Sequence, residues 1–89
     1  MTPVVYRESA EYDLAAIREY FSAISHLTFN NVMADINATI AILNVSPKAG
    51  YVYKTDRRRL VSAKYRFAIS YAYHRERVEI VGIYRSQNR

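Results

Sequence analysis

The sequence has no cysteine and no tryptophan, and its 89 residues include only two glycines and two prolines. Without cysteine the chain has no disulfide framework and no thiolate metal site. Two isolated glycines exclude a glycine-rich phosphate-binding loop. The only histidines, His26 and His74, stand far apart with no carboxylates at ligand spacing. The sequence therefore shows no metal site and no nucleophile triad, and we expect no cofactor.

Long apolar runs are absent as well. The longest purely apolar stretches cover a few residues, whereas a membrane-spanning helix needs about 20. The N-terminus lacks the basic region and apolar stretch of a signal peptide. The apolar content of 51% is too high for a disordered chain. We therefore expect a soluble, cytoplasmic protein without membrane association, folded as one domain over residues 1–89.

Positive charge is concentrated in the second part of the chain. Residues 1–50 carry three basic and five acidic groups, a net charge of −2, whereas residues 51–89 carry ten basic and three acidic groups, a net charge of +7. Eight of the ten bases are arginines, whose planar guanidinium groups suit phosphates and carboxylates. Such a field favours encounters with acidic partners, either nucleic acid or an acidic protein segment.

The first half of the sequence predicts a strand followed by two helices. Residues 3–7 are β-branched and aromatic, which favours a strand. Ser9 is then a candidate N-cap, and apolar residues recur at helical spacing at Ala10, Leu14, Ile17, Phe21 and Ile24. After a short connection, in which Ser25 or Thr28 would cap the next helix, a second stripe of this kind comprises Phe29, Val32 or Met33, Ile36, Ile40 and Leu43. Two such helices joined by a short loop form a helical hairpin.

Beyond Pro47 and Gly50 the apolar period changes from that of a helix to that of a strand. We expect Gly50 to provide conformational freedom for a turn. Residues 65–73 alternate as a strand, residues 78–84 form an internal strand, and residues 57–62 form a strand joined to residue 65 by a tight turn. The predicted order is β-α-α-β-β-β. This is an α+β fold with a helical hairpin packed on one face of a small, largely antiparallel sheet.

With metal sites and nucleophile triads absent, arginine and tyrosine are the remaining candidates for binding residues. On a strand, Arg57 and Arg59 point to one face, and Arg58 and Leu60 point to the other. These arginines either protect a sheet edge from aggregation or bind an anion or a partner. On the simplest interpretation most tyrosines belong to the core, among them Tyr65, Tyr71 and Tyr73. The candidate binding residues are Arg57, Arg58, Arg59, Arg66 on the neighbouring strand, Tyr84, Arg85 after the last strand, and Arg89.

This order of elements, with particular residues, resembles the RelE/ParE superfamily of toxins from type II toxin–antitoxin modules. The resemblance is carried by four segments and covers nearly the whole chain. These are the helix with Ala10, Asp13, Leu14, Ile17 and Tyr20, the helix exit from Ile42-Leu43 to Pro47 and Gly50, the strand motif Arg58-Arg59-Leu60, and the closing hairpin of residues 69–83.

The resemblance implies a toxin that causes growth arrest, is neutralised by an acidic antitoxin encoded beside it, and stabilises a plasmid or chromosomal region. ParE-like members inhibit DNA gyrase, whereas RelE-like members cleave mRNA on the ribosome. The sequence departs from the nuclease pattern in four ways. Arg85 stands where many nucleases have histidine, residues 57–62 contain no glutamate, Ala68 replaces the usual strand arginine, and the chain stops at Arg89 without a further helix.

The resemblance therefore favours a ParE-like gyrase inhibitor with no catalysis of its own. Two alternatives stay open. One is a RelE-like, ribosome-dependent mRNA endoribonuclease, whose catalytic residues would be Arg57, Arg59, Arg66 and Arg85. The other is a non-toxic domain that binds nucleic acid or an acidic peptide.

Overall fold

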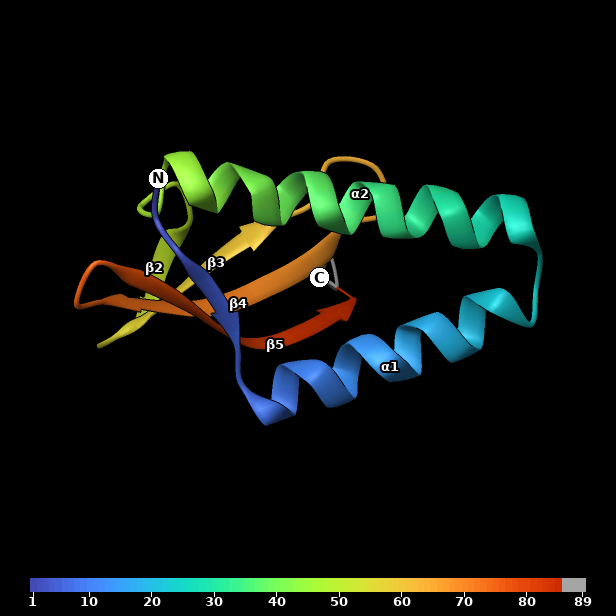
Figure 1. Ribbon diagram of the computed structural model, residues 1–89, viewed down its shortest axis with the longest axis horizontal. Helices are drawn as coiled ribbons and strands as arrows, with labels where there is room; N and C mark the ends of the chain where they lie inside the picture. The colour runs from blue at the N-terminus through green and yellow to red at the C-terminus, as the bar shows by residue number, and fades with distance from the viewer. Residues whose placement is uncertain (86–89) are drawn as a thin grey trace.

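The computed structural model describes residues 1–85 as two helices packed on a five-stranded sheet (Figure 1). The elements are β1 (Val4–Tyr6), α1 (Glu8–Ser22), α2 (His26–Val45), β2 (Tyr51–Lys54), β3 (Arg57–Val61), β4 (Phe67–His74) and β5 (Arg77–Arg85). The strand order is β1-β5-β4-β3-β2, in which only the β1–β5 pair is parallel. The α+β prediction is confirmed, and β2 adds an edge strand that the sequence patterns did not indicate.

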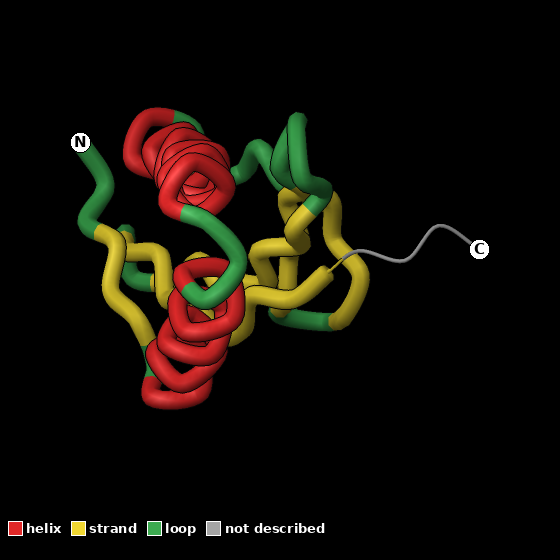
Figure 2. The backbone as a smooth tube through the Cα atoms, turned by 90° about the vertical axis from the view of Figure 1, so that its right-hand side faces the viewer, coloured by secondary structure: helices red, strands yellow, loops and turns green. Residues whose placement is uncertain are grey.

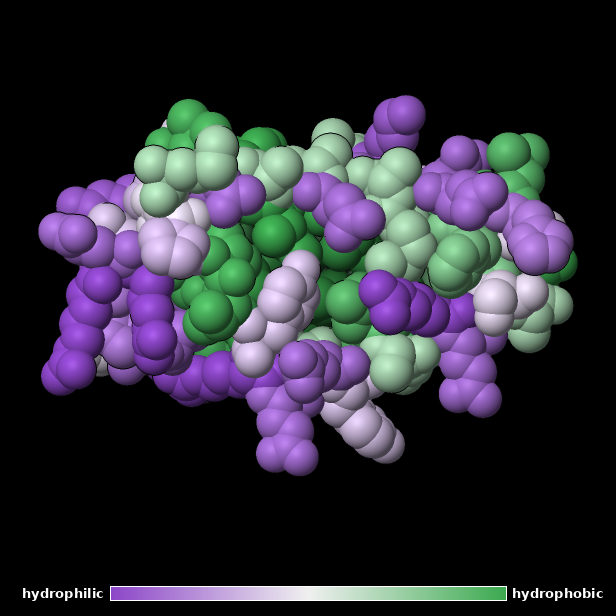
Figure 3. Space-filling model, in the orientation of Figure 1, coloured by the Kyte–Doolittle hydropathy of each residue, from purple (hydrophilic) through white to green (hydrophobic). Residues whose placement is uncertain are grey.

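Both helices lie on one side of the sheet, and the core lies between them and the strands (Figure 2). The α2 stripe is confirmed, because Val32, Ile36, Ile40 and Leu43 are all buried. Ser25 caps this helix, accepting a hydrogen bond from the Thr28 amide at 3.0 Å. Viewed from the helix side, apolar side chains show between the two helices, and hydrophilic groups gather at the left-hand end (Figure 3).

Two predictions for α1 are wrong. Ile24 is exposed and does not belong to the buried stripe, because the helix ends at Ser22 before this position. Ser9 is not the N-cap. The helix begins at Glu8 with Arg7 at the N-cap position, two residues earlier than predicted, and the Ser9 hydroxyl instead donates to the Val81 carbonyl at 2.6 Å.

The side chains of α1 cover the part of the β5 edge that β1 does not reach. β1 pairs with β5 only from Val78 to Ile80, so the edge of β5 beyond that point lacks a strand partner. The Ser9 hydroxyl satisfies one carbonyl there, and the Asp13 carboxylate accepts from the Ile83 amide at 3.1 Å. These bonds fix α1 against the sheet, since unpaired buried backbone groups are costly.

The predicted strand around residues 65 and 66 is also wrong, because β4 begins only at Phe67. Arg66 lies in a turn with φ of 61°, outside the range of strands. The buried carboxylate of Asp35 on α2 holds this turn, accepting from the Lys64 amide at 3.2 Å and the Tyr65 amide at 2.8 Å. Burial alone would raise the pKa of Asp35, but hydrogen bonds from Ser62 and these two amides outweigh it and lower the pKa.

Gly50 is required for space and not for a special backbone conformation. The described glycines have no positive φ. A Cβ atom on Gly50 would lie 2.7 Å from the Arg59 carbonyl oxygen and 2.9 Å from the Tyr71 ring. The buried Tyr71 hydroxyl donates to the Pro47 carbonyl at 2.8 Å and accepts from the Gly50 amide at 2.9 Å. The loop after α2 is therefore packed directly on the core.

Candidate functional site

The most concentrated group of polar and aromatic side chains lies on the face of the sheet opposite the helices. We call this face the open face. Register places Arg59 of β3 beside Ser70 of β4, and Ser70 beside Gly82 of β5. Tyr51 and Tyr53 of β2 reach this face from one side, and Tyr84 of β5 reaches it from the other. We call Arg59, Tyr51, Tyr53, Ser70 and Tyr84 the Arg59 cluster.

The Arg59 guanidinium lies between aromatic rings. Its Cζ atom is 4.0 Å from the centre of the Tyr53 ring and 5.5 Å from that of Tyr84, and Nη1 donates to the Tyr51 hydroxyl at 3.4 Å. The Tyr53 and Ser70 hydroxyls are hydrogen-bonded to each other. Long side chains thus lie over the small residues of β4, and Ala68 and Ala72 are buried although no helix covers them. Cation–π contacts hold the guanidinium in place.

The electrostatics of the cluster keep a fixed positive charge on the open face. The hydrogen bond to Tyr51 is the main reason that the pKa of Arg59 is raised, and burial raises the pKa of the Tyr84 hydroxyl. Within residues 1–85, Arg59 forms no ion pair with a carboxylate, and its buried Nε has no hydrogen-bond partner. Such a group can bind a carboxylate or phosphate, but a guanidinium is too basic to act as a general base.

The three consecutive arginines occupy different environments. Arg58 and Arg59 point to opposite faces, as expected from strand alternation. Arg58 Nη1 donates to the Gly50 carbonyl at 2.8 Å and the Lys48 carbonyl at 3.2 Å, so this arginine ties the loop after α2 to β3. Arg57 pairs with the neighbouring Asp56 at 2.9 Å. Only Arg59 joins the tyrosines of the cluster.

The remaining predicted site residues do not form one group. Arg66 is exposed in the turn before β4, so it does not project from the sheet. Arg85 lies at the end of β5 on the helix side, with its guanidinium 5.2 Å from the Phe67 ring and its Nε donating to the Tyr65 carbonyl at 3.2 Å. Arg89 lies outside the described residues. The structure thus brings Arg59 and Tyr84 together and separates them from the other candidates.

Sequence reasoning missed Tyr51 and Tyr53. These tyrosines stand at alternate positions just before the arginine run, which is a strand-like spacing. Their strand is short, and its pairing with β3 shifts register between Val52 and Lys54. A pattern this brief does not reveal that Tyr53 reaches across β3 to Ser70 on β4.

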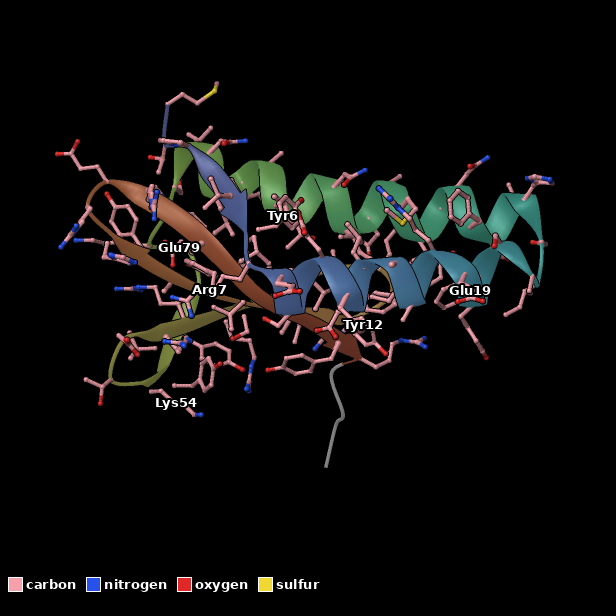
Figure 4. The ribbon with its side chains drawn as sticks, turned by 60° about the horizontal axis from the view of Figure 1, so that its bottom comes forward. Tyr6, Arg7, Tyr12, Glu19, Lys54 and Glu79 are labelled. Carbon is pink, nitrogen blue, oxygen red and sulfur yellow. The ribbon has the colours of Figure 1, made fainter. Side chains whose placement is uncertain are left out.

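A second charged cluster is centred on Glu79 of β5 (Figure 4). Its carboxylate pairs with Arg7 at 2.7 Å, Arg77 at 2.6 Å and His74 at 3.4 Å. Hydrogen bonds from Arg7, followed by Arg77, lower the pKa of Glu79 to about 2. This cluster joins the start of α1 to the β4–β5 hairpin, and it therefore has a structural role.

Between residues 1 and 85, no three histidine, aspartate or glutamate side chains are grouped so that they could hold a metal ion. In that range, neither helix is both long and apolar enough to cross a membrane.

These elements define an α+β fold in which a helical hairpin covers one face of an antiparallel meander extended by a parallel N-terminal strand. A chain of the solved structure described as the "Chromosomal ParDE TA system from P. aeruginosa" has the same fold, with a TM-score of 0.81 over 98% of both chains. The two sequences are 19% identical, so the likeness establishes the ParE-like fold alone. No family model matches the chain, and no curated protein matches it.

Proposed function

We propose that the chain is the toxin of a type II toxin–antitoxin module, of the ParE type. It acts in the cytoplasm, inhibits DNA gyrase and is neutralised by an acidic antitoxin encoded beside it. The observation that carries this proposal is the fold, which matches a chain of a ParDE system over 98% of both lengths. The motifs of the helices and of the β4–β5 hairpin support the same assignment.

The open face favours action by binding over catalysis. The Arg59 cluster presents a permanent cation flanked by tyrosine rings, which suits recognition of an acidic surface. Proton transfer near neutral pH usually needs a histidine or a carboxyl group with a shifted pKa. On this sheet His74 pairs with Glu79 and takes part in the other cluster. In this proposal Arg59 and Tyr84 contact gyrase, and inhibition follows from occupancy.

Regulated expression followed by a gyrase assay tests the proposal. Induction should arrest growth, and co-expression of the protein encoded by the adjacent reading frame should restore it. The purified chain should then block supercoiling of relaxed plasmid by gyrase, and the neighbouring protein should relieve the block. Normal supercoiling with the chain in excess contradicts the assignment of gyrase as the target.

The permanent charge on Arg59 also suits a RelE-like nuclease, because a guanidinium can stabilise a phosphate transition state. Primer extension on translated mRNA would then show new cuts within codons, which the gyrase proposal does not predict. A non-toxic nucleic-acid-binding domain would instead leave growth unchanged. Its binding would weaken steeply with salt, because phosphate neutralisation releases counterions.

A further inference from the structure

The outer face of α2 has no charged side chain. This helix has 20 residues, and its only Asp, Glu, Lys or Arg is Asp35, which is buried. The 15 residues of α1, in contrast, include five charged side chains. In Figures 1 and 2 α2 lies at the outer edge of the molecule, and no helix or strand covers its outer side. Because a solvent-facing helix surface normally carries charge, this face suits contact with protein better than contact with water.

The exposed residues of α2 repeat with the spacing of a coiled-coil seam. Separations of four and three residues alternate along the outer side of the helix, which is the a/d pattern of heptads. This α2 seam comprises Leu27, Asn31, Ala34, Ala38, Ala41 and Val45. All six residues are exposed, and the exposed fractions of Leu27 and Val45 are 71% and 76%. The opposite side of α2 packs on the core through Phe29, Ile36 and Leu43, so the helix has one pattern for each side.

Asparagines flank the α2 seam at intervals of seven residues. Asn30, Asn37 and Asn44 each come directly before a position of the seam. An amide side chain has both donors and an acceptor, so it can pair with the same side chain of a second copy. If two α2 helices pack antiparallel, Asn37 lies near its own counterpart and Asn30 lies near Asn44 of the other copy. A parallel pair would instead set the asparagines opposite Asp35 and Ile42, so the asparagine spacing favours the antiparallel arrangement.

A hollow beside the α2 seam has room for side chains of a second copy. It has a volume of about 490 Å³ and lies between α2 and the turn that connects β3 to β4. Its lining comprises Asn31, Ala34, Asp35, Ala38, Ala63, Lys64 and Tyr65. In the antiparallel arrangement Ile42 of one copy lies at the Asn31 end of this hollow in the other copy. Ile42 is 48% exposed in the single chain, so pairing would remove an apolar side chain from water.

The charges that border the α2 seam do not oppose self-association. On one side Lys64 stands beside a negative charge, because its backbone amide donates to the Asp35 carboxylate at 3.2 Å. On the other side Glu11 and Arg18 of α1 line a hollow that they share with Asn37. A two-fold axis at Asn37 reverses the direction of α1, so Glu11 of each copy lies toward Arg18 of the other. Opposite charges therefore meet at this border.

We infer that two copies of the chain pair through the α2 seam, with the helices antiparallel and a two-fold axis near Asn37. The pairing goes beyond the proposed function and does not depend on it, because the open face lies on the far side of the sheet and stays free in both copies. An acidic partner would find no cation on the outer face of α2, whereas a second copy matches its asparagines and its bordering charges.

The size of the α2 seam indicates a weak pair. The seam is about 27 Å long at 1.5 Å per residue, and a helix is about 10 Å wide. Two such faces with their borders come close to the total buried area of about 1,000 Å² that a specific interface needs. We therefore expect a reversible dimer with a dissociation constant in the micromolar range.

Sedimentation equilibrium of the purified full chain over a range of concentrations measures the pairing. Ala38→Glu places a carboxylate in the α2 seam, and Ala16→Glu makes the same change at an exposed position of α1. Ala34→Lys places an ammonium group opposite residue 38 of the other copy. Because the chain has no cysteine, Asn37→Cys and Asn30→Cys each carry a single thiol, and a short bis-maleimide cross-linker tests which of them lies at the axis. Circular dichroism checks the fold of every variant.

We expect Ala38→Glu and Ala34→Lys each to weaken pairing at least about 10-fold, because each sets two like charges close to the axis. An equimolar mixture of the two variants should pair again, because opposite charges then face each other. Ala16→Glu should stay within about twofold of the unmodified chain. Cross-linking should be efficient for Asn37→Cys and weak for Asn30→Cys.

A chain that stays monomeric at millimolar concentration overturns the inference, as do folded seam variants that pair as tightly as Ala16→Glu. Stronger cross-linking through Asn30→Cys than through Asn37→Cys contradicts the antiparallel geometry. If the chain is monomeric and Ala38→Glu instead loses binding of the protein encoded by the adjacent reading frame, that protein occupies the face and the inference is wrong. None of these outcomes touches the proposed function, which is tested by growth arrest and supercoiling.

Discussion

The two faces of the sheet are built differently. On the helix side, α1 and α2 bury apolar residues of β4 and β5, such as Ile69, Tyr71 and Ile80, in one contiguous core. On the open face, the Arg59 guanidinium lies near the Tyr53 and Tyr84 rings, and the small residues Ala68, Ser70 and Ala72 of β4 are buried. The helix side is stabilised mainly by apolar burial, whereas the open face uses the stems and rings of polar side chains whose functional groups stay accessible.

This difference separates stability from function. Residues on the helix side cannot change without loss of packing, because protein interiors are close-packed. The open face keeps a cation in a fixed position although no carboxylate of residues 1–85 pairs with it. We therefore expect substitutions on the helix side to lower stability, and substitutions on the open face to reduce toxicity with little loss of stability. The four predictions below run from the largest expected effect on stability to the smallest.

Replacing Tyr71 should cause the largest loss of stability. Tyr71→Ala removes a fully buried ring and should lower the free energy of unfolding by about 3–5 kcal/mol. Tyr71→Phe keeps the ring but leaves the Gly50 amide and the Pro47 carbonyl without their partner, at a cost of about 1–3 kcal/mol. Urea unfolding measures both variants. Equal losses of unfolding free energy in the two variants would show that the Tyr71 hydroxyl, and not its packed ring, provides most of the stability.

Gly50→Ala tests whether the loop after α2 is packed as tightly as the structure indicates. The new methyl group would meet the Arg59 backbone, which cannot rotate away, and we expect a loss of about 1–3 kcal/mol from strain in the packed interior. Gly82→Ala is the comparison, because the nearest atom to its added Cβ is 3.4 Å away and belongs to the Asp13 side chain. An equal effect of both substitutions in thermal unfolding would contradict this account.

Arg58 and Arg59 are adjacent in sequence but should respond differently to replacement. Arg58→Ala loses hydrogen bonds to two backbone carbonyls and should lower stability by about 1 kcal/mol with little effect on toxicity. Arg59→Ala loses a partly exposed cation–π contact, costing about 0.5–1 kcal/mol, but should abolish toxicity. A growth assay paired with urea unfolding distinguishes them. Full toxicity of folded Arg59→Ala would refute the role of the open face.

The Glu79 cluster should produce a small acid-dependent change. Because the pKa of Glu79 falls from its usual 4.5 to about 2 on folding, its contribution is complete above pH 4.5 and is lost as the pH falls toward 2. The urea midpoint should therefore decline over this range, and Glu79→Gln should make that decline shallower. A decline of equal steepness in the variant would mean that other carboxylates account for it.

Regular apolar spacing predicted the helix side well. The α2 stripe, the β3–β4–β5 meander and the internal position of β5 all follow from spacing, since burial imposes a period on each element. The errors arise where tertiary contacts override local preference. Ser9 bonds β5 in place of its own helix end, and Arg66 adopts a left-handed conformation in a turn fixed by Asp35.

The candidate site was less predictable from sequence than the fold. The arginine run was visible as a charge cluster, but the sequence does not say that Arg58 binds carbonyls of the preceding loop while Arg59 stacks on Tyr53. These roles depend on β2, a strand of four residues whose pairing shifts register at Tyr53. Such a shift interrupts the alternation of the strand, so it leaves no periodic signal in the sequence.

The most direct test of the central claim is the supercoiling activity of purified gyrase in the presence of the chain, of Arg59→Ala and of Arg75→Ala, each confirmed as folded. Arg75 is an exposed arginine at the hairpin tip, so its replacement removes the same charge away from the Arg59 cluster. The account predicts that the unmodified chain and Arg75→Ala inhibit equally and that Arg59→Ala does not inhibit. Equal inhibition by all three, or by none, would contradict it.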